Sequence, residues 1–467
     1  MLLLLVVAAP ARPDTIVLKN GRRIFGSNVV EENGRVSYEV STGRLSLPRS
    51  IVDHIEYGPV PPGNSDESSS LPIAPPALEA SAASDEILRG AIHDGQIDRT
   101  YIAGLERAAR AGESGAADRA AIGHHAAAQF ELSHGAIDRA LAEERAALGF
   151  APGQPDLLMN VAYLHLRRGE YRDALENVEL ARRTAPDSTE AAKLAGWAWY
   201  GMNDLDHAIA EWQRSLATHP DAGVQAALEK ALRDRSVEED FKENESSHFT
   251  LRYQGGAQPV LAREVLRTLE LHFSAIESEL RFTPREPIGV VLYTRETFAD
   301  ITRTPNWVGA LNDGRIRVPV QGLTAVSPEL SRVLKHELTH SFLAQKTTGH
   351  CPVWLQEGLA QWIEGKRSGE NAAALVQVYD AGHAAPLVSL EGSWMRFPSD
   401  TAAYVYPWAL ANVEYIVQSG GMGDITRVLE RIGEGDSTEV ALREVLRLDY
   451  ADLAQSTAEY LRRSYLH

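Results

Sequence analysis

Two histidines and a glutamate are spaced so that they can bind a metal ion and use it. Residues 333–342 contain His336, Glu337 and His340, which form the pattern H-E-x-x-H. Residues four apart lie on one face of an α-helix, so the two imidazoles can hold one Zn²⁺ together. Glu337 lies beside them, where its carboxylate can take a proton from a water that the metal acidifies. The pattern therefore predicts metal-assisted hydrolysis.

The segment that carries this pattern has the features of a helix. Ser327 is a suitable N-cap, Pro328 suits the first helical position, and Glu329 adds an acid to the first turn. An apolar stripe follows at helical spacing, formed by Leu330, Val333, Leu334, Leu338 and Phe342. We expect a half-buried helix with both histidines at the edge of its buried face. The competing interpretation is a helix with two ordinary surface histidines.

The next segment offers a third ligand. A catalytic zinc site takes three protein ligands and leaves one position for water or substrate. Residues 352–364 read as a second, amphipathic helix, and Glu357 lies 17 positions after His340 (357 − 340). The chain has one cysteine, Cys351, which excludes an intramolecular disulfide and a cysteine-rich metal site.

H-E-x-x-H followed by W-L-x-E-G-L-A-x-W-x-E resembles the gluzincin zinc metallopeptidases, the group that contains thermolysin and the aminopeptidase N family. The sequence is most similar to bacterial peptidase MA-like domains. The resemblance implies Zn²⁺ as cofactor, Glu357 as the third ligand and Glu364 as a partner of a ligand histidine. Gln356 differs from the Asn that usually precedes the ligand in aminopeptidases. A metzincin would need His at position 346, which is Lys346, and His350 is interpreted as a loop residue.

The resemblance also implies an oxyanion donor and a strand that binds substrate. In gluzincins a tyrosine near the start of a later helix points at the zinc. Residues 402–410 precede a predicted long helix, and Tyr404 fits this role best, with Tyr406 second. The alternative is that both tyrosines pack with Trp408. Residues 308–320 read as a hairpin with an Asp-Gly turn, and one of its strands would pair with an extended substrate.

These features predict a zinc metallopeptidase that cleaves a peptide or protein substrate, with Glu337 as general base. Two alternatives belong to other classes. One is a scaffold or adaptor protein whose peptidase domain is vestigial. The other is a metal-dependent hydrolase of non-peptide esters or amides, which the metal chemistry alone does not distinguish from a peptidase.

The whole chain is read as a multidomain protein. Its 467 residues suggest about three domains, and a net charge of −18 argues against nucleic-acid binding. Residues 1–11 resemble a signal peptide, although a buried N-terminal strand is the alternative. No other segment has the roughly 18 uninterrupted apolar residues of a membrane span. We therefore expect an exported protein, periplasmic or secreted.

Three regions are expected before the catalytic domain at residues 237–467. Residues 12–57 alternate as strands, with turns at Asn20-Gly21, Asn33-Gly34 and Thr42-Gly43, and predict a small all-β domain, a sheet or an SH3-like barrel. Residues 58–84 are rich in Pro, Ser and Ala and read as a linker. The catalytic domain itself is expected to be α+β and thermolysin-like.

Residues 85–236 repeat with a period of 34. Pro152, Pro186 and Pro220 keep this spacing (186 − 152 and 220 − 186). So do two further sets of small or turn-forming residues: Gly135, Gly169 and Asn203, and Ala140, Ala174 and Ala208. The pattern resembles the tetratricopeptide repeat (TPR), an all-α solenoid of helix pairs. We expect a groove that binds substrate or a protein partner. A rigid spacer that holds the catalytic domain is the alternative.

Overall fold

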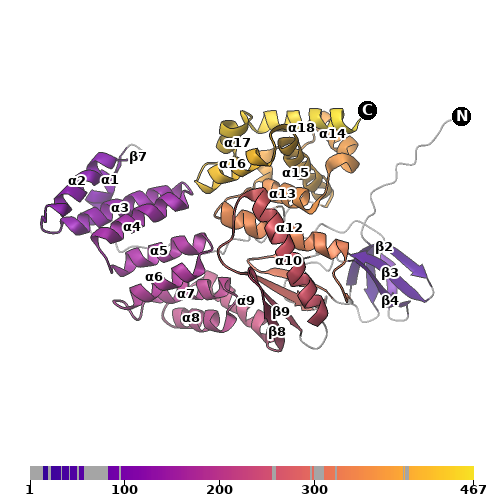
Figure 1. Cartoon of the computed structure of the whole chain (residues 1–467), viewed down its shortest axis with the longest axis horizontal. Coiled ribbons are helices and arrows are strands. Elements are labelled where there is room, and N and C mark those ends of the chain that lie inside the picture. The colour runs from indigo at the N-terminus through magenta and orange to yellow at the C-terminus, as the bar shows by residue number, and fades with distance from the viewer. Residues whose placement is uncertain are drawn as a thin grey trace.

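The protein, described here by a computed structural model, is mostly helical and has a mixed sheet in its C-terminal half (Figure 1). The structure describes residues 14–18, 23–32, 34–40, 43–49, 52–56, 82–93, 96–254, 259–294, 297–298, 310–320, 323–392, 394 and 399–466. The predicted signal peptide, the linker up to residue 81, the turn residues Asn20, Gly21, Asn33 and Thr42, and residues 308–309 lie outside these ranges. Within them, no helix combines the length and the apolar character needed to cross a bilayer.

Five antiparallel strands make up the described part of the N-terminal region. They are β1 (Asp14–Leu18), β2 (Arg23–Glu32), β3 (Arg35–Val40), β4 (Gly43–Pro48) and β5 (Val52–Glu56). Their order is β4-β3-β2-β1-β5, so β4 and β5 lie at opposite ends of one sheet. Gly34, in the turn between β2 and β3, has a φ of +73°, a conformation that favours glycine.

The helical region forms an arc of antiparallel helix pairs (Figure 1). It begins with α1 (Ala82–Ala91), the short strands β6 (Ile92–His93) and β7 (Gln96–Ile97), and α2 (Arg99–Arg110). The pairs that follow are α3 (Ala116–Ser133) with α4 (Ile137–Phe150), α5 (Pro155–Arg167) with α6 (Tyr171–Arg182), and α7 (Thr189–Gly201) with α8 (Leu205–Thr218). A single helix, α9 (Ala222–Glu238), ends the arc and spans the predicted boundary at residues 236 and 237.

The 34-residue period has a direct structural meaning. Gly135, Gly169 and Asn203 each lie in the turn within one helix pair, and all three have positive φ (74°, 71° and 66°). Glycine and asparagine are the residues that adopt this conformation at low cost. The alanines of the same period are fully buried and let the paired helices approach closely. Helix pairs of this period are therefore present, while their assignment to the TPR family stays a prediction.

The C-terminal half is organised around a five-stranded mixed sheet. Its strands are β8 (Phe241–Glu245), β9 (Phe249–Gln254), β10 (Ile288–Tyr293), β11 (Leu311–Asn312) and β12 (Ile316–Pro319), in the order β11-β12-β10-β9-β8. The three central strands are parallel, and β8 and β11 pair antiparallel at the two edges. The predicted hairpin is thus present as β11 and β12, with β11 as an edge strand.

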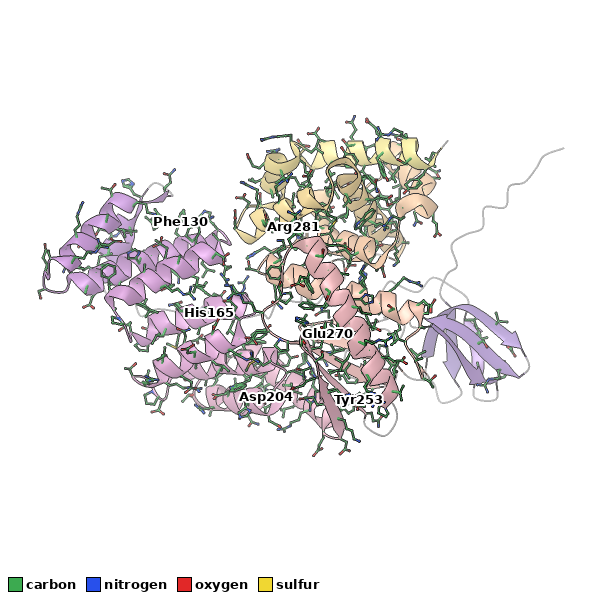
Figure 2. All side chains as sticks on the ribbon, in the orientation of Figure 1. Phe130, His165, Asp204, Tyr253, Glu270 and Arg281 are labelled. Atoms are coloured by element: carbon green, nitrogen blue, oxygen red, sulfur yellow. The ribbon has the colours of Figure 1, made fainter. Side chains whose placement is uncertain are left out.

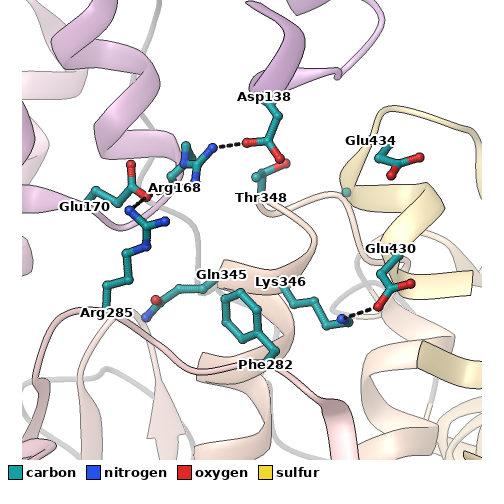
Figure 3. Close-up of a pocket in the computed structure, with 11 residues that line it drawn as sticks. Asp138, Arg168, Glu170, Phe282, Arg285, Gln345, Lys346, Thr348, Glu430 and Glu434 are labelled. Atoms are coloured by element: carbon teal, nitrogen blue, oxygen red, sulfur yellow. Dashed lines mark hydrogen bonds and ion pairs between the residues drawn. The ribbon is translucent and has the colours of Figure 1, made fainter. Parts of the chain in front are cut away.

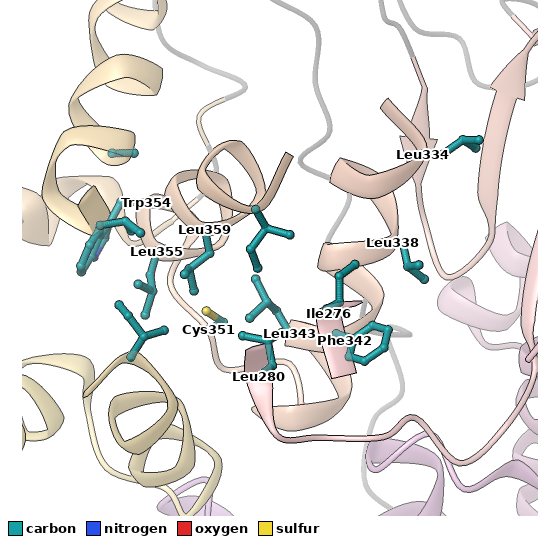
Figure 4. Close-up of a cluster of buried hydrophobic side chains, with 14 of the residues drawn as sticks. Ile276, Leu280, Leu334, Leu338, Phe342, Leu343, Cys351, Trp354, Leu355 and Leu359 are labelled. Carbon is teal, nitrogen blue, oxygen red and sulfur yellow. The ribbon is translucent and has the colours of Figure 1, made fainter. Parts of the chain in front are cut away.

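The two faces of this sheet are covered differently. The helices α10 (Pro259–Leu280) and α12 (Pro328–Lys346) pack on one face through a large apolar core. Figure 4 shows part of this core, where Ile276 and Leu280 of α10 meet Phe342 and Leu343 of α12. Tyr253 in β9 faces the same core, and Glu270 lies on α10 (Figure 2). The other face meets α9, where a smaller apolar cluster adjoins several buried charges.

Helices complete the C-terminal half. They are α13 (Val353–Glu364), the 3₁₀ turn η2 (Ser368–Asn371), α14 (Ala372–Asp380), the 3₁₀ turn η3 (Leu387–Leu390), α15 (Ser399–Gly420), α16 (Met422–Gly433), α17 (Thr438–Leu446) and α18 (Tyr450–Tyr465). One expectation is wrong: residues 402–410 do not precede the long helix but form its first half. Val405 and Trp408 are fully buried there, and burying this apolar face outweighs the break that Pro407 would favour.

Candidate metal centre

Helix α12 holds the two histidines rigidly. The Ser327 hydroxyl caps it by accepting a hydrogen bond from the Leu330 amide (3.1 Å), and Pro328 occupies the first turn, as predicted. Leu334 and Leu338 are fully buried and fix the rotation of the helix against the core. His336 and His340 then lie at the edge of the apolar face. The imidazole of His336 keeps 17% of its surface exposed, and that of His340 only 6%.

Helix α13 brings Glu357 to the same place, and a glycine allows its close approach to α15. A Cβ atom on Gly358 would lie 2.5 Å from the carbonyl oxygen of Ala409, a distance that real side chains do not adopt. The Gln361 side-chain amide joins the two helices by donating hydrogen bonds to the Glu357 and Tyr406 carbonyl oxygens, both at 3.0 Å. Glycine at position 358 is therefore part of what places the neighbouring carboxylate.

The three expected ligands converge. The Nε2 atoms of His336 and His340 are 3.2 Å apart, and each lies 3.6 Å from a carboxylate oxygen of Glu357. Zn–N and Zn–O bonds of about 2.0–2.2 Å in a tetrahedron place ligand atoms roughly 3.3–3.6 Å apart. These side chains therefore form a group that fits a tetrahedral metal ion.

Glu337 is set apart from the ligands by its surroundings. It is 4% exposed, and burial raises the pKa of its carboxyl to about 7. Its Oε2 atom is buried and has no hydrogen-bond partner within the described ranges. A carboxylate in such a place is suited to accept a proton from a small molecule near neutral pH, because its proton affinity matches the medium.

Glu364 contacts His336 on the side of the ring that faces away from Glu357. Its Oε1 atom is 3.4 Å from Nδ1 of His336, the ring nitrogen that does not face Glu357, and 2.9 Å from the Lys366 ammonium. Burial lowers the pKa of His336, but hydrogen bonds with Glu357 and Glu364 outweigh it and raise this pKa to about 10. The two carboxylates thus favour a positive charge at the ring of His336. This is the arrangement expected for a residue that orients a metal ligand.

The two candidate oxyanion donors, Tyr404 and Tyr406, pack against different tryptophans. Tyr404 stacks on Trp408 (ring centroids 5.9 Å apart), and its buried hydroxyl has no hydrogen-bond partner in the described part of the chain. Tyr406 instead packs edge-on against Trp394 (4.8 Å). The alternative, in which both tyrosines stack on Trp408, is met by Tyr404 alone. A buried hydroxyl with its donor unused keeps Tyr404 the better candidate for an oxyanion donor.

Asn312 is a residue whose importance the sequence did not reveal. In the sequence it reads only as the residue before the Asp-Gly turn of the 308–320 hairpin. Its side-chain amide donates to the Glu337 carbonyl oxygen (2.8 Å) and to the Ser341 hydroxyl (2.7 Å), so it joins β11 to the helix of the histidines. No sequence signal distinguishes this asparagine from a turn residue, because its partners lie 25 and 29 positions away.

A second acidic and histidine-containing cluster lies in the helical region. His165, Glu170 and Asp173 bring ligand atoms close together. Glu170, however, also accepts ion pairs from Arg168 (3.0 Å) and Arg285 (2.7 Å). Two guanidinium groups already neutralise this carboxylate and would repel a cation, so this cluster is a structural ion-pair group.

A family model matches part of the C-terminal half. Residues 277–463, from the end of α10 to α18, match a family model described as Peptidase MA superfamily. No curated protein matches the chain. The match supports a gluzincin-like peptidase domain over this region, which is less than half of the chain, and indicates a peptidase-like hydrolase.

Proposed function

We propose that the protein is a zinc-dependent peptidase. The observation that carries the proposal is the convergence of two imidazoles and one carboxylate within 3.6 Å, next to a buried glutamate. The donor set of two nitrogens and one oxygen is that of hydrolytic zinc sites. Peptidases of the matched superfamily typically depend on zinc, which agrees with this donor set.

The residues divide the chemistry among them. His336, His340 and Glu357 would hold Zn²⁺, and Glu364 would orient the ring of His336. Zn²⁺, when bound, acidifies a water and polarises the scissile carbonyl. Glu337 would take the proton of the attacking water and then pass it to the leaving amine. The Tyr404 hydroxyl would donate a hydrogen bond to the developing oxyanion.

The substitution Glu337→Gln tests this assignment. It keeps the size of the side chain and removes the basic oxygen, so hydrolysis should fall by at least about a hundredfold. Zinc content, measured by inductively coupled plasma mass spectrometry, should remain one ion per chain. Turnover is measured with quenched fluorescent peptides and with casein.

Glu329→Gln is the matched control, because it removes a partly exposed acid from the first turn of the same helix. It should retain full activity. Wild-type turnover in Glu337→Gln would exclude this residue as the base. Absence of stoichiometric zinc in the wild-type chain would instead favour the scaffold function. Cleavage of esters or non-peptide amides in place of peptides would favour the third class.

A further inference from the structure

The last helix of the repeat region carries two fully buried acids that face the catalytic sheet. Asp234 and Glu238 of α9 each have no exposed surface. Opposite them on β12 and its turn lie Arg315 and Arg317, which are 1% and 0% exposed. Charged side chains are almost never this deeply buried unless they are paired.

The buried acids and arginines form several hydrogen-bonded ion pairs with one another. Arg317 binds both carboxylate oxygens of Asp234, with Nη1–Oδ1 3.0 Å and Nη2–Oδ2 2.7 Å. Arg315 reaches Asp234 (3.2 Å) and Glu238 (2.6 Å). Tyr293 of β10 donates its hydroxyl proton to Glu238 (2.6 Å) and accepts a hydrogen bond from Arg317 (2.9 Å). Bidentate contacts of this kind fix orientation as well as distance.

The turn of the hairpin belongs to the same group. Asp313 accepts from Nε of Arg317 (2.9 Å) and forms an ion pair with Lys230 of α9 (2.6 Å). On the opposite face of the sheet, the neighbouring Asn312 holds the Glu337 carbonyl. The hairpin β11–β12 is therefore fixed from both sides, by α9 on one face and by the histidine helix on the other.

The turns within the helix pairs also contact the catalytic half. Gly135 lies against Gly435. A Cβ atom on Gly435 would come within 2.5 Å of the His134 carbonyl oxygen. Gly169 lies against Gln345, at the end of α12, and Asn203 lies against Gly289 of β10. The three turns of the 34-residue period thus meet three different segments of the catalytic half.

A pocket of about 250 Å³ lies along this junction, and its lining charges come from both sides (Figure 3). Arg168 contacts Asp138 within the repeats, and Arg285 of the catalytic half pairs with Glu170. Arg167 adds a hydrogen bond to the Thr348 carbonyl oxygen (3.2 Å). His165 lies on the same side of the repeats (Figure 2). The contacts extend along the arc, so α9 is held at a defined position on the sheet.

We propose that Asp234 and Glu238 are positioning residues for catalysis. They fix the hairpin β11–β12 beside Glu337, which makes the repeat region part of the catalytic unit although the matched family region begins only at residue 277. Burying ion pairs is costly and is weak evidence for added stability, whereas a defined geometry is a use for which they are well suited. This inference rests on the proposed peptidase function for its catalytic consequence, and on the ion pairs alone for its structural one.

The test is Asp234→Asn in the full-length zinc-loaded protein, read out in two ways. Hydrogen–deuterium exchange should become faster in residues 310–320 and stay unchanged in residues 353–364. With an extended peptide substrate, kcat/KM should fall roughly tenfold to a hundredfold, mainly through a higher KM, because the hairpin is expected to pair with the substrate and misplacing such an element has effects of this size. Zinc content should not change, since no ligand is touched.

Arg235→Gln is the matched control, because among the described residues this neighbour on α9 pairs with Asp206 alone (3.5 Å), at an exposed position. It should leave both readouts at wild-type values. If Asp234→Asn does not fold, Tyr293→Phe removes one hydroxyl from the same group without changing any charge, and it should show the same two effects more weakly.

The outcomes separate the two proposals. Unchanged exchange in residues 310–320 would overturn the positioning role whatever the activity. Faster exchange with wild-type kcat/KM would overturn its catalytic consequence. If the wild-type chain binds zinc but cleaves no peptide, the proposed function fails, and faster exchange in the variant would still support the structural role of α9.

Discussion

Glu337 differs from an ordinary surface carboxylate because of burial. Its pKa of about 7 lies well above the usual value of about 4.3 for glutamate, and desolvation is the main cause. Nearby, His340, the second candidate ligand, has its pKa lowered to about 4 by burial, which favours a neutral imidazole that can donate its lone pair. Burial thus suits one residue to act as a base and another to act as a metal ligand within one helical turn.

Glu364 offers a prediction at this scale. Glu364→Gln removes the charge behind His336 but leaves all three ligands, so zinc affinity should fall about 10–100-fold while stoichiometric binding persists at high zinc. Competition with a fluorescent zinc chelator measures this affinity. Glu370→Gln, which changes a nearby exposed acid, should have no effect. An unchanged affinity in Glu364→Gln would show that this carboxylate does not support the ligand.

Helices α13 and α15 show how an element contributes to the site. They cross at Gly358, where the Ala409 carbonyl would touch any side chain. Glu357 immediately precedes this crossing, so the depth at which α13 sits decides whether its carboxylate reaches the imidazoles. The local packing of one glycine is thereby connected to metal binding.

Gly358→Ala should separate the two helices. Overpacking of this kind costs about 1–3 kcal/mol of unfolding free energy, and zinc affinity should fall as well. Gly149→Ala is the control, because nothing lies within 4 Å of a Cβ there and alanine favours an α-helix by about 0.5–1 kcal/mol. Thermal denaturation and zinc titration measure both variants. Equal stability and affinity in Gly358→Ala and wild type would contradict the proposed crossing.

The sequence predicted some elements well and others not at all, for physical reasons. The histidine helix carries a cap, a proline and an apolar stripe, all local signals, and it begins where expected. Helix α15 begins at Ser399, ahead of residues expected to precede it, because burial of Val405 and Trp408 outweighs the break that Pro407 favours. The approach of His336, His340 and Glu357 to one another was predictable from spacing together with family resemblance, while their role as metal ligands stays a prediction. The α9–β12 ion pairs were not, because they join residues about 80 positions apart, and an Arg-x-Arg strand otherwise reads as solvent-facing.

At the scale of the molecule, the catalytic sheet depends on a helix outside the matched family region. Helix α9 covers one face of the sheet and neutralises Arg315 and Arg317. A buried charge that loses its partner destabilises a protein by about 3–5 kcal/mol. The repeat region and the catalytic half should therefore unfold together.

Truncation tests this dependence. A chain that begins at residue 240 loses α9 and should be insoluble or unfolded by circular dichroism. A chain that begins at residue 154 keeps α5 to α9 and every ion pair of the network, so it should fold with a lower melting temperature. A soluble fragment from residue 240 that binds zinc as tightly as the full chain would contradict the expectation.

The contacts made by Gly135, Gly169 and Asn203 set a limit on how this molecule can vary. Helical arrays usually gain or lose units freely, because each unit touches only its neighbours. Here every unit between α3 and α9 also has its own assigned place on the catalytic half. Inserting one more 34-residue unit would move α9 away from β12. The guanidinium groups of Arg315 and Arg317 would then lose their carboxylate partners. The contacts between these turns and the C-terminal half therefore limit the number of repeats that this chain can have.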